Sequence, residues 1–180
     1  LIQGESGAGK SRLIRLVAGI IKPTEGSVYL NDNNLNNLHL NTYRASLGLA
    51  LSDETPFEGS ILDNITFGDT DITQAEIDDV IKNTKLSQFI KESEKGINTI
   101  IYPEAKQTSY TVAKKIILAR AIVKKPKLLI LEDPLEHFEK DEALELIKFL
   151  TDASHPWTLI VVSFNKDWAS NCTESITLKK

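Results

Sequence analysis

One octapeptide limits the folds open to this chain more than any other feature. Residues 4–11 read Gly-Glu-Ser-Gly-Ala-Gly-Lys-Ser and match the pattern G-x-x-x-x-G-K-[ST] in full. A short apolar stretch at residues 1–3 precedes the motif, and residues 12–21 carry apolar side chains at helical spacing. Strand, glycine-rich loop and helix, in that order, form the context that this motif requires. We therefore expect an α/β fold in which the loop joins a strand to a helix.

The spacing within the motif predicts a site for the phosphates of a nucleotide. Glycines allow the backbone to turn with its N–H groups pointing inward, and the start of the helix adds partial positive charge. At this spacing Lys10 reaches the β- and γ-phosphates, and the Ser11 hydroxyl is placed to ligate Mg²⁺. A glycine-rich turn that merely connects strand to helix is the structural alternative. The residues expected to contact the nucleotide are Gly4, Glu5, Ser6, Gly7, Ala8, Gly9, Lys10 and Ser11.

Strand and helix patterns alternate along the rest of the chain. Short apolar or β-branched runs predict buried strands, and longer periodic runs predict helices. Strands are expected at residues 47–51, 128–131 and 158–162, and helices at residues 112–123 and 139–150. The middle third lacks strand signals. These features predict a largely parallel sheet covered by helices, with a helical insertion in the middle of the chain.

Composition and charge exclude several classes of protein. The 180 residues include one cysteine, Cys172, and three scattered histidines, which excludes an internal disulfide and a zinc site. No uncharged apolar run is long enough to span a bilayer. A net charge of −4 argues against broad binding to nucleic acid, so we expect no nucleic-acid partner. The basic residues that we interpret as a solvated helix face are Lys114, Lys115, Arg120, Lys124, Lys125 and Lys127.

Several segments together carry a family resemblance. Residues 23–30 read Pro-Thr-Glu-Gly-Ser-Val-Tyr-Leu, and residues 116–121 read Ile-Ile-Leu-Ala-Arg-Ala and lead into residues 128–134. With the motif at 4–11, these segments resemble the nucleotide-binding domain of the ATP-binding cassette (ABC) family. Residues 47–68 look most like the exporter branch of that family. The resemblance covers essentially the whole chain.

This resemblance implies a P-loop NTPase three-layer fold with a largely parallel sheet and an inserted helical subdomain. Residues 1–58 and 125–180 are expected to form the nucleotide-binding core of a single domain, and residues from about 59 to 124 the helical signature subdomain. The chain contains no methionine, so we expect a fragment. The expected missing parts are the early β-strands, the aromatic residue that stacks on adenine, and any membrane domain.

The resemblance also implies cofactors and partners. An ABC cassette binds ATP with Mg²⁺ and dimerises head-to-tail with a second cassette, as a homodimer or a heterodimer. Two ATP molecules lie between the phosphate loop of one subunit and the signature motif of the other. The dimer drives a transmembrane domain, fused or separate, at the cytoplasmic face of the cell membrane.

Two acids at the end of the expected strand depart from the family order. The family has Asp then Glu, whereas this chain has Glu132 then Asp133. By resemblance Glu132 holds Mg²⁺ with Ser11, and Asp133 is the candidate catalytic base. Asp133 is one methylene shorter than glutamate, and a misplacement of about 1 Å costs on the order of 10²-fold in rate. Neighbouring strand residues project to opposite faces, so the acids cannot exchange roles; in a shifted register Pro134 would fall at the base position.

Three other family positions have changed. The histidine that contacts the γ-phosphate aligns with Phe164, and the glutamine that senses it aligns with Ser52. We expect Phe164 to lie in the core and Ser52 in a loop. The signature Leu-Ser-Gly-Gly-Gln aligns with residues 108–112, where only Ser109 is kept and Tyr110 replaces a glycine. Ser109 is therefore the signature residue expected to contact the partner's nucleotide.

The departures favour a cassette that binds Mg-ATP and powers or regulates export while its own site hydrolyses ATP weakly. A fully active transporter ATPase with adapted motifs and a non-hydrolysing structural half are the alternatives. A soluble P-loop kinase or GTPase does not explain residues 116–121, and the Asn-Lys-x-Asp motif of GTPases is absent from the sequence.

Overall fold

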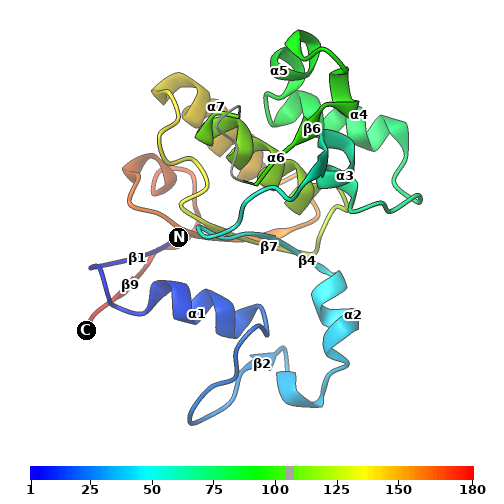
Figure 1. The fold of residues 1–180 in the computed structure, drawn as a ribbon. Coiled ribbons are helices and arrows are strands. Elements are labelled where there is room, and N and C mark those ends of the chain that lie inside the picture. The colour runs from blue at the N-terminus through cyan, green and yellow to red at the C-terminus, as the bar shows by residue number, and fades with distance from the viewer. Residues whose placement is uncertain (104–107) are drawn as a thin grey trace.

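A five-stranded parallel sheet forms the centre of the protein (Figure 1). The computed structural model describes residues 1–103 and 108–180, and residues 104–107 of the predicted helical subdomain lie outside this description. The strand order is β4-β7-β8-β1-β9, and every neighbouring pair is parallel. The strands are β1 (Ile2–Gly4), β4 (Leu47–Ala50), β7 (Leu128–Glu132), β8 (Thr158–Val162) and β9 (Ile176–Leu178).

Helices cover both faces of this sheet (Figure 1). One face carries α1 (Lys10–Val17), α2 (Leu40–Ala45) and a small hairpin of β2 (Tyr29–Leu30) and β3 (Asn33–Asn34). The elements of the other layer are α3 (Ile61–Thr66), α4 (Gln74–Asn83), α5 (Ser87–Glu92), α6 (Tyr110–Ile122), α7 (Lys140–Leu150) and the antiparallel pair β5 (Gly59–Ser60) and β6 (Ile100–Ile101). The predicted α/β fold with a largely parallel sheet is thus confirmed.

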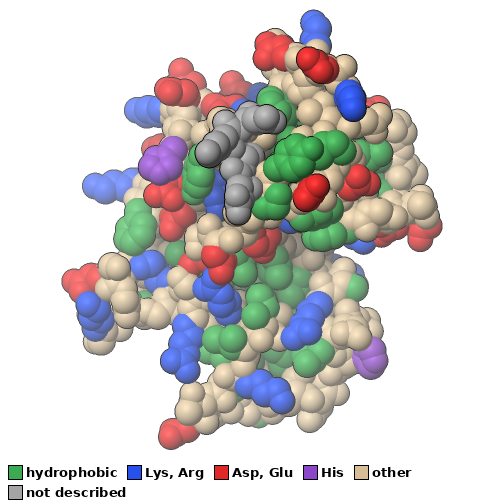
Figure 2. Space-filling view, viewed as in Figure 1, with side chains coloured by type: hydrophobic (Ala, Val, Ile, Leu, Met, Phe, Trp, Pro, Cys, Tyr) green, Lys and Arg blue, Asp and Glu red, His purple; other side chains and the backbone are tan. Residues whose placement is uncertain are grey.

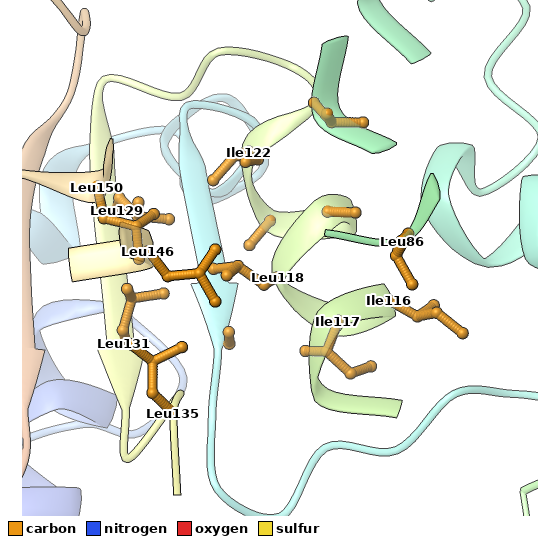
Figure 3. Packing of buried hydrophobic residues seen from close by; sticks show 14 of the residues in the cluster. Leu86, Ile116, Ile117, Leu118, Ile122, Leu129, Leu131, Leu135, Leu146 and Leu150 are labelled. Carbon is orange, nitrogen blue, oxygen red and sulfur yellow. The ribbon is translucent and has the colours of Figure 1, made fainter. Parts of the chain in front are cut away.

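The apolar run of β7 is buried on both faces because side chains alternate along a strand. Leu129 and Leu131 pack with α6 and α7 in the larger core cluster (Figure 3). Ile130 belongs to the second cluster, which includes Ile14 of α1. The same alternation directs Glu132, the last residue of β7, toward the α1 face. The sheet therefore brings this acid to the side on which the glycine-rich loop lies.

Three local features either differ from the sequence prediction or were not predicted. The helix after the loop ends at Val17 rather than near residue 21, since Gly19 adopts φ +66 and turns the chain. The asparagine-rich segment forms β3 and a 3₁₀ turn anchored by buried Leu35. Strand β9 was not predicted, because its three residues are few and its pairing partner is at the opposite end of the chain.

The interpretation of the basic cluster as one solvated face is wrong for Lys114. Its side chain is 6% exposed, and its Nζ donates a hydrogen bond of 2.8 Å to the carbonyl of Ser52. Two other members do lie at the surface in ion pairs, Lys124 with Asp69 and Lys125 with Glu76. On the face shown in Figure 2, charges of both signs are interspersed with exposed apolar groups. Within residues 1–103 and 108–180, no helix is both long and apolar enough to cross a bilayer.

Candidate functional site

A pocket of about 370 Å³ lies at the carboxyl ends of β1, β7 and β8. This is the edge at which parallel α/β sheets bind ligands. It joins the glycine-rich loop to the two acids that the sequence singled out. The lining residues are Ser6, Gly7, Gly9, Lys10, Ser11, Arg12, Glu132, Asp133, Val162 and Phe164.

The loop requires glycine at positions where the backbone has positive φ. Gly4, Gly7 and Gly9 have φ values of +146, +80 and +87. At Gly4 the neighbouring strand adds a steric reason, because a Cβ there would lie 2.5 Å from the carbonyl oxygen of Leu178. Gly9 is the N-cap of α1, so Lys10 begins the helix. The predicted strand, loop and helix are all present in this order.

Lys10 is held inside the loop. Its side chain is 8% exposed, and its Nζ donates hydrogen bonds of 2.8 Å to the carbonyl of Gly4 and 2.9 Å to the carbonyl of Glu5. The ammonium therefore lies beside the backbone of the loop, and Lys10 lines the pocket. This placement puts a fixed positive charge where the sequence predicts phosphate.

Glu132 is fixed by the loop that follows β4. The residue is 4% exposed, and its Oε2 accepts hydrogen bonds from the Ser52 hydroxyl at 2.9 Å and the Ser52 backbone N–H at 3.2 Å. Ser52 lies in a loop, as expected. Nη2 of Arg15 is 3.9 Å from the same oxygen and 2.9 Å from Oδ1 of Asp53. Sequence reasoning missed Arg15, although its position one helical turn after Ser11 places both on one face of α1.

Asp133 lies just outside the strand. It adopts φ +42, and its backbone N–H donates to the carbonyl of Val162 at 2.8 Å. The alternation expected for two strand residues therefore does not extend to Asp133, and both acids line the same pocket. Burial raises the pKa of the Asp133 carboxyl above its usual value, although the backbone N–H of Phe164 lowers it in part. A raised pKa suits a group that must accept a proton.

The residues present fit a magnesium ion that is bound together with a nucleotide. The Ser11 hydroxyl and the Glu132 carboxylate both line the pocket, and hard oxygen ligands of this kind are those that Mg²⁺ prefers. In the described part of the chain, no group of three or more His, Cys, Asp or Glu side chains is arranged to hold a metal. Mg²⁺ usually completes its shell with substrate phosphates and water, so few protein ligands suffice.

Phe164 is not a core residue, contrary to expectation. It is 63% exposed, and the centre of its ring lies 4.6 Å from Nζ of Lys10. Strand β8 ends at Val162, and Ser163 is buried while its hydroxyl accepts a hydrogen bond from the Asn165 N–H at 3.1 Å. This turn directs the next side chain outward. The aromatic ring therefore stands at the mouth of the pocket.

Ser109 lies outside this pocket, at the start of α6. Its hydroxyl caps the helix by accepting a hydrogen bond from the Val112 N–H at 3.3 Å. The next residue, Tyr110, is exposed, and its hydroxyl donates to Glu136 at 3.4 Å while its ring packs edge-on against His137. The segment that aligns with the signature motif is thus joined to the segment that follows the two acids.

Lys114 is a second residue that sequence reasoning missed. Its Nζ contacts the carbonyls of Leu51 and Ser52, in the loop that also holds Glu132. Burial lowers the pKa of Lys114, and the nearby Glu54 carboxylate opposes this shift. The sequence did offer one signal for a buried role, because Lys114 lies within an apolar helical run. Only the fold shows to which carbonyls it donates hydrogen bonds.

Comparisons with known proteins agree with this geometry. The chain is 32% identical over 162 residues to ABC transporter B family member 3 of Dictyostelium discoideum, covering 90% of this chain and 11% of that protein. It is 27% identical over 176 residues to human ATP-binding cassette sub-family B member 5, covering 98% of this chain and 14% of that protein. The chain thus spans a small part of these relatives.

The fold also matches a solved structure. A bacterial Atm1-family ABC exporter with ATP bound superposes with a TM-score of 0.90 at 23% identity, covering 99% of this chain and 31% of that one. The family model described as ABC transporter matches residues 1–136, which include the loop and both acids. By this match the chain belongs to the ABC transporter family, as a nucleotide-binding domain of the exporter-like type.

Proposed function

We propose that this cassette binds ATP with Mg²⁺ and pairs with a second cassette to power or regulate export through a transmembrane domain. The partner cassette is identical or related, and the transmembrane domain is fused or separate. The cassette then works at the cytoplasmic face of the cell membrane. Residues 1–58 and 125–180 serve as the nucleotide-binding core, and residues from about 59 to 124 as the signature subdomain.

The observation that carries this proposal is the pocket that joins Lys10 and Ser11 to Glu132 and Asp133. In the proposed complex the backbone of residues 4–11 and the Lys10 ammonium hold the phosphates. Ser11 and Glu132 hold Mg²⁺, which neutralises phosphate charge when bound. Ser109 contacts the nucleotide of the partner cassette rather than its own, in keeping with its position outside this pocket.

Hydrolysis at this site is proposed to be weak. A water molecule attacks the γ-phosphorus, the bond to the ADP oxygen breaks, and Asp133 accepts the proton of the water. The Asp133 carboxyl is shorter than the glutamate of the family, so it holds the water less well. Phe164 offers no hydrogen bond to the γ-phosphate, which removes a second stabilising contact.

The test measures nucleotide binding and phosphate release on one preparation of the complete protein that carries this cassette, with and without its partner cassette. We expect Mg-ATP to bind and Lys10→Ala to weaken binding by at least about 10²-fold, since the lysine is the fixed charge at the phosphates. Phosphate release is expected to be slow. Asp133→Glu is expected to increase it by about tenfold or more.

Other outcomes identify the alternatives. Rapid phosphate release that Lys10→Ala abolishes, and that Asp133→Glu does not increase, indicates a fully active ATPase with adapted motifs. Tight ATP binding with no release above the Lys10→Ala background indicates a non-hydrolysing structural half. Failure of the wild-type protein to bind any nucleotide contradicts the proposal.

A further inference from the structure

The exposed ring of Phe164 contacts the lysine that is proposed to bind phosphate. The Lys10 ammonium lies 4.6 Å from the centre of the ring. This distance is within the range of about 6 Å over which the face of an aromatic ring attracts a cation. Because Lys10 is nearly buried, water screens this attraction less than at an open surface.

Counting hydrogen-bond donors shows what a phosphate must displace. An ammonium has three N–H donors. In Lys10, two of them are used by the carbonyls of Gly4 and Glu5. The third has no acceptor among the described residues, and the Phe164 ring lies over the ammonium at 4.6 Å. A phosphate oxygen therefore reaches Lys10 by replacing one of these three contacts, and the ring contact is weaker than a charged hydrogen bond.

We propose that Phe164 is a positioning residue that lowers the affinity of this site for both ATP and ADP and contributes no preference for ATP over ADP. It acts through Lys10 by competing with the nucleotide phosphates for the ammonium. A phenyl ring also has no hydrogen-bond donor, so it gives the terminal phosphate of ATP no contact that ADP lacks. The inference rests on the proposed nucleotide binding and adds to it a residue that limits affinity.

The first experiment measures Kd for Mg-ADP and for a non-hydrolysable Mg-ATP analogue on the complete protein. Phe164→Leu removes the aromatic face and keeps an apolar side chain, so we expect both nucleotides to bind about threefold more tightly, with their ratio unchanged. Phe164→His supplies a donor, so we expect the ratio to shift by about tenfold toward the ATP analogue.

Phe67→Leu is the matched control. Phe67 is 64% exposed, and its ring lies 4.7 Å from Cζ of Arg120, so it also covers a cation. It does not line the pocket that contains Lys10. Phe67→Leu should leave both dissociation constants unchanged. If Phe164 had a purely structural role, every Phe164 variant would instead bind both nucleotides more weakly.

A second measurement needs no nucleotide. The ring current of Phe164 should shift the ε-methylene resonance of Lys10 upfield in lysine-labelled protein. This shift should disappear in Phe164→Leu and persist in Phe67→Leu. An unchanged Lys10 resonance in Phe164→Leu overturns the inference even if nucleotide affinity changes.

The two proposals fail in different ways. Three results would overturn the role of Phe164 while leaving the proposed nucleotide binding intact. The first is that Phe164→Leu binds nucleotide no more tightly than wild type, and the second is that Phe67→Leu gains as much affinity as Phe164→Leu. The third result is a ratio of the two dissociation constants that Phe164→His leaves unchanged. If the wild-type protein binds no nucleotide, both the proposed function and the role of Phe164 in affinity are overturned. The resonance of Lys10 then decides only whether the ring contact exists.

Discussion

The hydroxyl of Ser52 donates a 2.9 Å hydrogen bond to Glu132, a carboxylate that is almost completely buried. The backbone N–H of Ser52 adds a second bond to the same oxygen. The loop after β4 and the strand end at β7 are thus joined through one oxygen atom. The acid proposed to hold Mg²⁺ is thus oriented by Ser52, the residue that by resemblance aligns with the glutamine of the family.

This contact predicts an energetic coupling between the two residues. Ser52→Ala removes one of the two donors to a buried carboxylate, so we expect the free energy of unfolding to fall by about 1–2 kcal/mol. In a Glu132→Ala background the same change should have little effect. Urea unfolding of the four proteins measures the coupling, with Ser154→Ala on an exposed turn as the control. Additive effects of the two substitutions would contradict it.

The raised pKa of Asp133 predicts how stability depends on pH. The folded protein binds this proton more tightly than the unfolded chain, so the carboxyl lowers stability as pH rises from its usual value of 3.8 through the raised folded value. Asp133→Asn should therefore be more stable than wild type at neutral pH. The difference should shrink as pH falls below 3.8, where both states are protonated.

Unfolding midpoints in urea, followed from about pH 3 to pH 8, provide the measurement for Asp133. Asp32→Asn, on the exposed β2–β3 turn, is a matched substitution outside the pocket. If the difference in stability between Asp133→Asn and wild type stays constant across this pH range, the Asp133 carboxyl does not titrate as inferred.

Glu76 predicts the opposite dependence on pH. Hydrogen bonds from the backbone and hydroxyl of Thr73 and from Lys125 lower the pKa of Glu76 from 4.5 to about 2. The stabilisation is therefore complete above 4.5 and is lost as pH falls toward about 2. Glu76→Gln should be less stable than wild type at neutral pH and equally stable at the acid limit. Asp79→Asn in the same helix is the control, and a deficit that persists at the acid limit would reject the charge as its cause.

Gly4 predicts a steric limit at the start of the loop. A methyl group there would lie 2.5 Å from the carbonyl oxygen of Leu178, and φ is +146. We expect Gly4→Ala to lower the free energy of unfolding by about 2 kcal/mol or more. Gly26→Ala has positive φ but no heavy atom within 4 Å of its added Cβ, so it should cost only the strain. Calorimetric or urea unfolding measures both variants. If Gly4→Ala and Gly26→Ala lower the free energy of unfolding equally, the steric clash with β9 is excluded.

The elements predicted well from the sequence are those whose signal is local. The predicted strand at 158–162 coincides with β8, and the predicted helix at 139–150 agrees with α7 to within one residue. The motif at 4–11 requires a strand before it and a helix after it, and both are present. In each case the sequence pattern and the element that it predicts involve the same short stretch of residues.

The features that were missed depend on residues far apart in the chain. Strand β9 pairs with β1 at the other end of the sequence, so its three residues carry little local signal. An aromatic residue after a β-branched strand predicts core, yet the turn at Ser163 sends Phe164 outward to Lys10. Lys114 meets the carbonyl of Ser52 only when α6 packs beside β4.

The place of β1 between β8 and β9 has a consequence for synthesis on the ribosome. The segment that feeds the loop leaves the ribosome before the rest of the described chain, and its neighbours on both sides in the sheet are made near the other end of that chain. Contacts of such long sequence separation form late in folding. The loop therefore acquires its final geometry only after Ile176–Leu178 has emerged. A nucleotide present during translation would therefore bind only to chains in which β9 has already paired with β1.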